Sequence, residues 1–270
     1  MQNNTFIHIG LPKTGTTFLQ KCVFNNIEGV TLVYNNMIDI FKNSAVIISN
    51  ESISGFMVWQ PSDPKINILK ERIFNIKNMF VNPKIIIGFR EPASLVNSMF
   101  KQFLHEGGTC KFEQFYGDDP NTIVKPTDLI LSQYYNLIIK EFGIDNVFCY
   151  EFDEIKSNKD KLIKDLSLFM NLKQDLKILY KGNSINQGVP DNIELLLIKL
   201  NSVANYLNSK FNINLHDKSL PLTPRKLCQN YLPNLLGRQT IRTLVEIENV
   251  FNEDYSKLKM NILKSREIFR

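Results

Sequence analysis

TFIHIGLPKTGTTFLQKCVF, residues 5–24, places a short apolar strand, a turn with two glycines and an amphipathic helix in direct succession. Gly10 and Gly15 allow the backbone N–H groups between them to converge on one anion, because glycine has no side chain to block a close approach. The helix that starts near Gly15 adds the positive end of its dipole. The stretch therefore predicts a phosphate-binding loop. An ordinary surface turn is the alternative, but it requires one Pro, one Lys, two Gly and three Thr to coincide between a strand and a helix.

The lysine of this loop stands before the second glycine. In the Walker A loop, GxxxxGK[ST], lysine follows that glycine and precedes a hydroxyl that binds the metal ion. Here Lys13 precedes Gly15, and Thr16 occupies the position of the Walker lysine. The string PKTGTT resembles the 5′-phosphosulfate-binding loop of sulfotransferases, which use 3′-phosphoadenosine 5′-phosphosulfate (PAPS) as donor. The resemblance implies a catalytic Lys13. It also implies a donor-binding set of Pro12, Lys13, Thr14, Gly15, Thr16 and Thr17.

A second polar motif follows another apolar run, Lys84–Phe89, which is typical of a buried parallel strand. Arg90 stands at the end of that run, where its planar guanidinium is suited to a phosphate, and Ser98 stands two turns into the next predicted helix. The pattern R-x-P-x5-S resembles the 3′-phosphate motif of sulfotransferases, which implies that Arg90 and Ser98 bind the 3′-phosphate of the donor. The alternative is a helix cap followed by a solvent-exposed serine.

Weaker similarities extend the resemblance over roughly residues 5–205. Residues 146–155 resemble the strand and turn that follow the 3′-phosphate helix in sulfotransferases, although a purely structural role of this segment is the more common case. Asn183–Asn186 resembles an Asn-x-Ser turn of bacterial sulfotransferases. Lys181 and Gly182 resemble an element that other members fold over the 3′-phosphate, which implies that they bind the donor. The fuller glycine-rich signature of the family is absent.

Transfer of a sulfuryl group to a hydroxyl needs a general base, and two residues are candidates. Glu51 follows the apolar strand of residues 44–49 and resembles the glutamate of a Ser-x-Glu element that acts as base in bacterial and glycosaminoglycan-type sulfotransferases. A charge near the cap of the next element is the alternative for Glu51. His105 stands at a predicted helix end, where a histidine is more often a partner of the helix dipole than a base. His8, inside the first strand, is expected to be a buried, hydrogen-bonded core residue.

Composition agrees with one soluble globular domain spanning residues 1–270. The chain has 270 residues, 43% hydrophobic and 22% charged, with a net charge of +5, which is too balanced for general nucleic-acid binding. Its four cysteines form no CxxC pair and are expected to be reduced thiols. The polar start of the chain does not resemble a signal peptide, and no apolar run approaches the ~20 residues that span a bilayer. We expect a cytoplasmic protein without a membrane span.

Alternating strand and helix patterns predict an α/β fold: a three-layer, P-loop-type parallel sheet with helices on both faces and a helical C-terminal extension. Two irregular stretches, residues 106–126 and 212–233, are candidate lids over the acceptor site. The predicted strands are 5–10, 30–34, 44–49, 84–89 and 146–151. The predicted helices are 15–25, 64–80, 92–105, 127–142, 158–171, 191–209 and 238–259.

The resemblance implies a sulfotransferase that moves a sulfuryl group from PAPS to a hydroxyl or amine acceptor without a metal ion. A carbohydrate acceptor is favoured because the resemblance is closer to the bacterial and glycosaminoglycan type than to the aryl type. Trp59, the only tryptophan, could stack on a sugar ring, although core packing is the more common role of such a residue. A P-loop kinase-like phosphotransferase and a non-catalytic nucleotide- or glycan-binding module are the alternatives.

Overall fold

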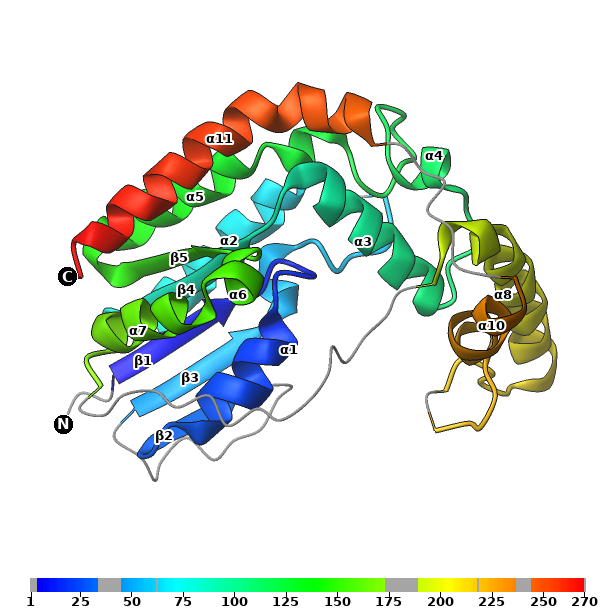
Figure 1. Cartoon of the computed structure of the whole chain (residues 1–270), viewed down its shortest axis with the longest axis horizontal. Helices are drawn as coiled ribbons and strands as arrows, with labels where there is room; N and C mark the ends of the chain where they lie inside the picture. The colour runs from blue at the N-terminus through cyan, green and yellow to red at the C-terminus, as the bar shows by residue number, and fades with distance from the viewer. Residues whose placement is uncertain are drawn as a thin grey trace.

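The centre of the fold is a five-stranded parallel sheet with the strand order β2-β3-β1-β4-β5. We obtained a computed structural model, which describes residues 4–33, 45–61, 63–172, 189–217, 219–236 and 244–269. From β1 the chain first builds β2 and β3 on one side and later β4 and β5 on the other (Figure 1). Because every pairing is parallel, all five strands end at the same edge of the sheet. The strands are β1 (Asn4–Ile9), β2 (Val30–Val33), β3 (Ala45–Asn50), β4 (Lys84–Phe89) and β5 (Val147–Glu151).

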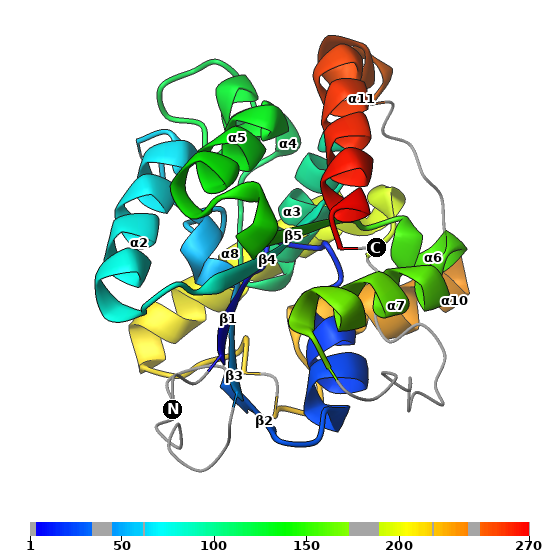
Figure 2. The same ribbon diagram turned by 90° about the vertical axis from the view of Figure 1, so that its left-hand side faces the viewer.

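Helices cover both faces of this sheet, as the sequence predicts. In Figure 2, α2 (Lys65–Met79) and α5 (Leu131–Phe142) lie on one side of the strands, whereas α1 (Thr16–Phe18), α6 (Glu154–Ser157) and α7 (Lys159–Met170) lie on the other. The predicted three-layer α/β class is therefore confirmed.

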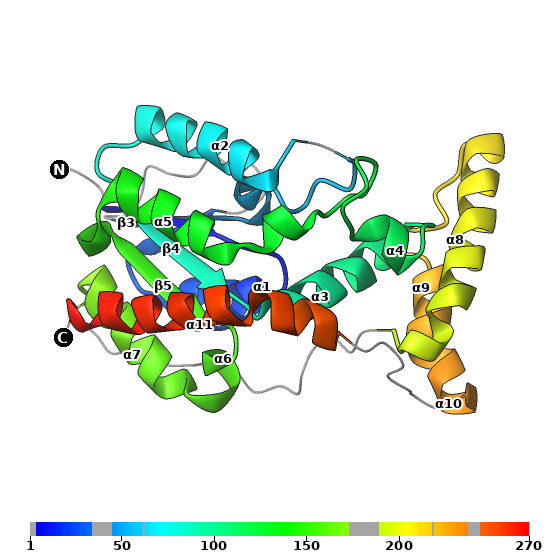
Figure 3. The same ribbon diagram turned by 90° about the horizontal axis from the view of Figure 1, so that it is seen from above.

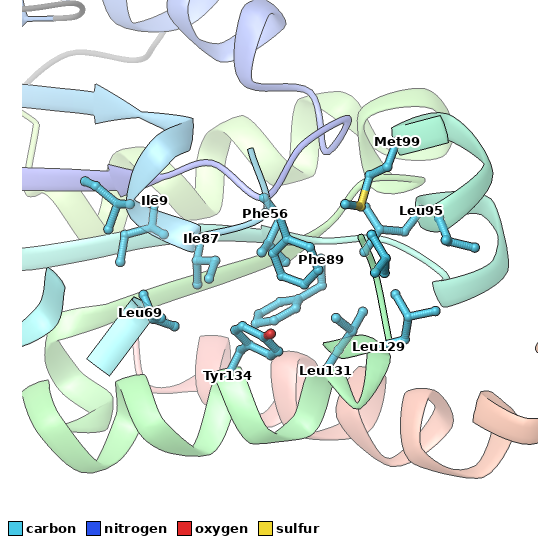
Figure 4. Packing of buried hydrophobic residues seen from close by; sticks show 14 of the residues in the cluster. Ile9, Phe56, Leu69, Ile87, Phe89, Leu95, Met99, Leu129, Leu131 and Tyr134 are labelled. Atoms are coloured by element: carbon cyan, nitrogen blue, oxygen red, sulfur yellow. The ribbon is translucent and has the colours of Figure 1, made fainter. Parts of the chain in front are cut away.

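Alternate side chains of the central strands supply the two halves of the core, because successive residues of a strand point to opposite faces. Ile9 and Ile87 pack with α2, α3 (Pro92–His105) and α5, and Figure 4 shows this cluster with Phe56 and Tyr134 at its centre. Phe6 and Ile86 point to the opposite face and pack with α7.

Local hydrogen bonds move several helix boundaries away from the predicted ones. The predicted helix 15–25 is a short α-helix that continues as a π-helix (Leu19–Val23) and a 3-10 turn (Phe24–Asn26). The helix predicted from residue 127 begins at Leu131, because Pro126–Leu129 forms a 3-10 turn in which the Asp128 carboxylate accepts from the backbone N–H groups of Lys65 and Lys125, at 2.8 and 2.9 Å. The short helix α6 was not predicted, because its sequence has no helical periodicity.

The described residues from 189 to 269 are mainly helical, as predicted. It contains α8 (Asp191–Phe211), α9 (Pro224–Lys226), a π-helix (Leu227–Tyr231), α10 (Leu232–Leu236) and α11 (Val245–Glu267). Helix α8 crosses the far end of α3, away from the sheet (Figures 1 and 3), and its Asn201 amide donates to the carbonyls of Leu104 and Gly108, both at 2.8 Å. Part of the residues 212–233 predicted to be irregular is therefore helical. The short helix α4 (Phe112–Phe115) lies in the other stretch predicted to be irregular, residues 106–126.

Helix α11 ends later than the sequence predicts and covers the β5 edge of the sheet. It extends to Glu267, beyond the expected end at residue 259, because its last turn is anchored: the nearly fully buried Arg266 pairs with Glu154 of α6. The expected start at residue 238 lies outside the described residues. Among the helices described, none is long and apolar enough to cross a membrane.

Candidate active site

The two motifs singled out in the sequence meet at the carboxyl edge of the sheet. The loop Gly10–Gly15 follows β1, Glu51 follows β3, and Arg90 follows β4. In the sheet, β1 lies between β3 and β4, so that the loop has Glu51 on one side and Arg90 on the other. Ligands of open α/β sheets bind at this edge, where the chain direction across the sheet reverses.

The loop after β1 is shaped to bind an anion. Lys13 has a φ of 63° and Gly15 a φ of 92°, which turn the backbone sharply before α1. Among the described residues, no carbonyl or side chain accepts from the backbone N–H groups of Lys13, Thr14, Gly15 or Thr16. Such a run of unpartnered N–H groups in a turn fits a phosphate or phosphosulfate group.

Two interactions fix the shape of this loop. The Thr14 hydroxyl donates to the Leu11 carbonyl at 2.7 Å and closes the turn from inside. A Cβ atom at Gly15 would lie 2.2 Å from Cδ1 of Ile155, so that glycine is required by space as well as by its positive φ. Thr17, by contrast, is exposed at the mouth of the loop.

Glu51 directs its carboxyl group over the start of the loop, toward Thr16. A Cβ atom at Gly10 would lie 2.7 Å from both Glu51 Cγ and Thr16 Oγ1, so that only glycine admits the two side chains together. The Thr16 hydroxyl lies beside the Glu51 carboxyl without reaching normal hydrogen-bond geometry to any described group. A cavity of about 270 Å³ opens beside this pair. Its lining residues are Thr16, Thr17, Gln20, Ser49, Asn50, Glu51, Ser52 and Met57.

Burial shifts the pKa values of Glu51 and Lys13 toward each other. Burial raises the pKa of Glu51 above its usual value, and the neighbouring Thr16 and Lys13 only partly oppose this effect. Burial lowers the pKa of Lys13, opposed by Glu51 and reinforced by the cations Arg225 and Arg90. An acid and a base with converging pKa values are typical of proton-transfer sites.

Arg90 ties the second motif to the first. Its Nη1 donates to the Lys13 carbonyl at 3.0 Å, its Nε donates to the Ser94 hydroxyl at 2.9 Å, and its guanidinium lies 4.5 Å from the ring centre of Phe152. Glu91 caps α3 by accepting from the N–H groups of Ala93 and Ser94. Ser98 is half-buried and lies one turn beyond Ser94 on the same face of α3.

His105 lies near Lys13 but is a poor proton acceptor. Both ring nitrogens are buried and hydrogen-bond to nothing in the described part of the chain. Burial lowers the pKa of His105 to about 3, helped by the nearby cations Arg225, Lys13 and Lys101. The ring is therefore neutral, and a neutral ring gives a helix dipole no charge to interact with.

Arg225 is one of the residues near this site that sequence reasoning missed. It comes from α9, in the predicted lid of residues 212–233, and lies close enough to Lys13 and His105 to lower their pKa values. Its Nε donates to Gln229 at 3.0 Å. The only signal in the sequence is Pro224-Arg-Lys. Such a basic pair suits an anionic polysaccharide, but it is equally typical of solvated surface charge.

Trp59 packs against the hydrophobic core. Its ring packs edge-on against Phe103 at 6.0 Å and tilted against Phe115 at 6.2 Å, and its indole N–H donates to Glu106. This agrees with core packing, although the ring stays partly accessible. The remaining expected donor residues, Lys181 and Gly182, and the Asn183–Asn186 turn lie outside the described residues. No group of three or more His, Cys, Asp or Glu residues is placed to hold a metal ion within the described ranges.

Comparisons with known proteins gave matches among solved structures only. A scan against protein-family models and a sequence search of curated proteins found no match. A sulfotransferase from Alicyclobacillus acidocaldarius is similar over 79% of this chain and 97% of its own, with 14% identity and a TM-score of 0.46. A mouse sulfotransferase, SULT7A1, solved in complex with PAP, is similar over 98% of this chain and 88% of its own, with 16% identity and a TM-score of 0.44. Similarity at this level assigns no role to any residue.

Proposed function

We propose that this protein is a sulfotransferase that moves a sulfuryl group from PAPS to a hydroxyl or amine group of an acceptor, with a carbohydrate hydroxyl as the favoured class. One observation carries the proposal: Lys13 lies inside the anion-binding loop, before Gly15 instead of after it, and the Glu51 side chain lies against the start of the same loop. A lysine inside the turn is suited to a phosphosulfate, whereas a P-loop kinase needs lysine and a metal-binding hydroxyl after the turn.

The donor would be held at both ends. The unpartnered N–H groups of the loop and the hydroxyls of Thr16 and Thr17 would bind the 5′-phosphosulfate. Arg90 and Ser98 would bind the 3′-phosphate from the neighbouring strand end and helix. Two N–H groups of Arg90 already donate to protein oxygens, so its side chain is oriented before the ligand arrives.

Lys13 would act where charge develops. As the sulfuryl group leaves, negative charge grows on the phosphate oxygen it leaves behind, and the Lys13 ammonium with the loop N–H groups would stabilise that charge. In this proposal these groups supply the positive charge that a metal ion supplies in kinases.

Glu51 would take the proton of the acceptor. Its carboxyl lies at the wall of the 270 Å³ cavity, and its raised pKa makes its carboxylate a stronger base than an ordinary surface glutamate. Asn50, Ser52 and Gln20 give the same cavity polar walls, which suits a sugar better than an apolar phenol. The alternative base, His105, has a pKa lowered to about 3, several units below neutral pH, and would be far weaker.

The first test compares ligands by thermal shift in the presence of EDTA. PAP (3′-phosphoadenosine 5′-phosphate) is the product that the donor leaves behind. It should raise the melting temperature, because a ligand at 100-fold its Kd adds about 2.7 kcal/mol of stability. ATP with Mg²⁺, measured without EDTA, should shift it less. A larger shift with ATP and Mg²⁺ would favour the kinase-like alternative. Binding of PAP without sulfate transfer to any member of a panel of desulfated glycans would favour the non-catalytic module.

A further inference from the structure

A line of buried polar groups crosses the sheet beneath the proposed donor loop. His8 is 0% exposed, and its Nδ1 lies 2.7 Å from the Ser49 hydroxyl, the residue directly opposite in the β1–β3 register. Ser49 Oγ in turn accepts from the Gln20 amide at 2.9 Å. On the other side, His8 Nε2 lies 3.5 Å from the hydroxyl of Tyr150. This phenol reaches His8 across β4 because the intervening residue is Gly88, where a Cβ atom would lie 2.3 Å from the Tyr150 ring.

The line connects the two halves of the site. At one end, Ser49 and Gln20 line the cavity beside Glu51. At the other end, Tyr150 interacts with the hydroxyl of Thr14 inside the anion-binding loop. The Thr14 hydroxyl donates to the Leu11 carbonyl, which can only accept.

That last bond sets one consistent direction for the protons of the line. With the Thr14 proton used on Leu11, a Tyr150 hydroxyl that contacts Thr14 donates to it and accepts from His8. His8 then carries its proton on Nε2 and accepts at Nδ1 from Ser49. The distance of 2.7 Å agrees with an O–H donor, which is typically shorter than an N–H donor.

The same proton direction sets the orientation of the Gln20 side-chain amide. Ser49 donates its only proton to His8, so it can only accept from Gln20, whose NH₂ group must therefore face Ser49. The amide oxygen of Gln20 has no hydrogen-bond partner among the described residues. It is left for a ligand in the cavity.

We propose that His8, acting through Ser49, is a positioning residue that holds the Gln20 amide with its oxygen toward the cavity, where it accepts a hydrogen bond from a neutral donor group of the acceptor substrate. A second hydroxyl beside the reacting hydroxyl of a sugar is such a group. The inference rests on the proposed function for the identity of the ligand, whereas the proton arrangement of His8, Ser49 and Gln20 does not depend on it.

The proton arrangement is tested by ¹⁵N NMR of the full chain without ligand, with His8 assigned by comparison with a His8→Gln variant. The expected result is a neutral ring protonated on Nε2 and unprotonated on Nδ1 at pH 7. A ring protonated on Nδ1 would overturn the inference, because His8 would then donate to Ser49 and the Ser49 proton would no longer be committed to His8, so that His8 would not set the orientation of the Gln20 amide. Failure of the protein to bind PAP would contradict the proposed function but leave this measurement unaffected.

The ligand contact is tested by kinetics with desulfated heparin as the probe acceptor. Gln20→Met should raise the KM for this glycan about tenfold, the upper range for loss of one neutral hydrogen bond, with kcat within about twofold and PAP affinity unchanged. Ser49→Ala should give the same pattern, because it removes the group that holds the Gln20 amide. Gln133→Met, at an exposed position of α5, is the matched control. An unchanged KM in Gln20→Met, or an equal loss in Gln133→Met, would contradict the inference.

Discussion

The guanidinium of Arg90 donates to the main-chain carbonyl of Lys13 at 3.0 Å, across 77 residues of sequence. This bond joins the loop after β1 to the strand end of β4, so that the two predicted phosphate sites are parts of one structure. It also helps the lysine to tolerate a φ of 63°, because the carbonyl turned by this conformation is bound by the half-buried guanidinium of Arg90. A shift of either motif would therefore disturb the other.

Loss of the Arg90 side chain should weaken the discrimination between PAP and AMP. Hydrogen bonds to a charged group contribute about 1.5–3 kcal/mol, so Arg90→Ala should reduce the preference for PAP roughly 10- to 100-fold. Ser98→Ala should reduce it less. Calorimetric titration of each variant with both nucleotides measures the effect, with Arg72→Ala of α2 as the control arginine. Equal binding of AMP and PAP by the wild-type protein would refute this assignment.

Replacement of Lys13 should affect turnover far more than donor binding. Its ammonium is proposed to act on charge that appears only as the sulfur–oxygen bond breaks, so Lys13→Ala should lower kcat by about 10²–10³-fold while PAP affinity changes less than tenfold. Lys21→Ala, an exposed lysine on the following π-helix, is the control. Strict dependence of transfer on Mg²⁺, or an unchanged kcat in Lys13→Ala, would contradict the role given to this lysine.

Glu51 as the base makes two linked predictions. Glu51→Gln should lower kcat by about 10²–10⁴-fold and abolish the acidic limb of the pH–rate profile. Glu106→Gln should move that limb to lower pH, because the negative charge of Glu106 raises the pKa of Glu51 and the base must be ionised to act. His105→Ala should stay active. If His105→Ala were inactive and Glu51→Gln active, the base would be His105 and not Glu51.

Buried His8 should make the fold sensitive to acid. Burial lowers the pKa of His8 from 6.5 to about 3, so the unfolded chain binds a proton that the folded protein excludes. Above pH 6.5, neutral His8 is buried without penalty. As the pH falls from 6.5 toward 3, the free energy of unfolding decreases by about 1.4 kcal/mol per pH unit on account of His8. In urea unfolding, His8→Gln should be less stable than wild type at pH 7 but should lose less stability between pH 6.5 and 5. Parallel losses in the two proteins would show that His8 is not buried neutral.

The strands, and the position of the two proposed phosphate motifs at strand ends, could be predicted from the sequence because their signals are local. Apolar runs ending at Gly10, Ser49 and Arg90 identify parallel strands, and in such a sheet all strand ends share one edge. That is enough to bring Lys13, Glu51 and Arg90 together without knowledge of any long-range contact.

The rest depends on tertiary packing, which leaves no local pattern. Arg225 reaches the site only because α8 packs across the end of α3, and its own helix is three residues long. The extension of α11 depends on Arg266 pairing with Glu154, 112 residues away. The partner of Gln20 follows from the strand register that sets His8 opposite Ser49. None of these contacts alters the periodicity by which a sequence indicates its elements.

Calorimetric titration of the full chain with PAP in EDTA tests the central claim most directly, because it needs no knowledge of the acceptor. The account predicts that PAP binds without metal and that AMP binds at least tenfold more weakly. It also predicts that ATP with Mg²⁺, titrated without EDTA, binds no more tightly than AMP. Tight binding of ATP with Mg²⁺ and none of PAP would contradict it.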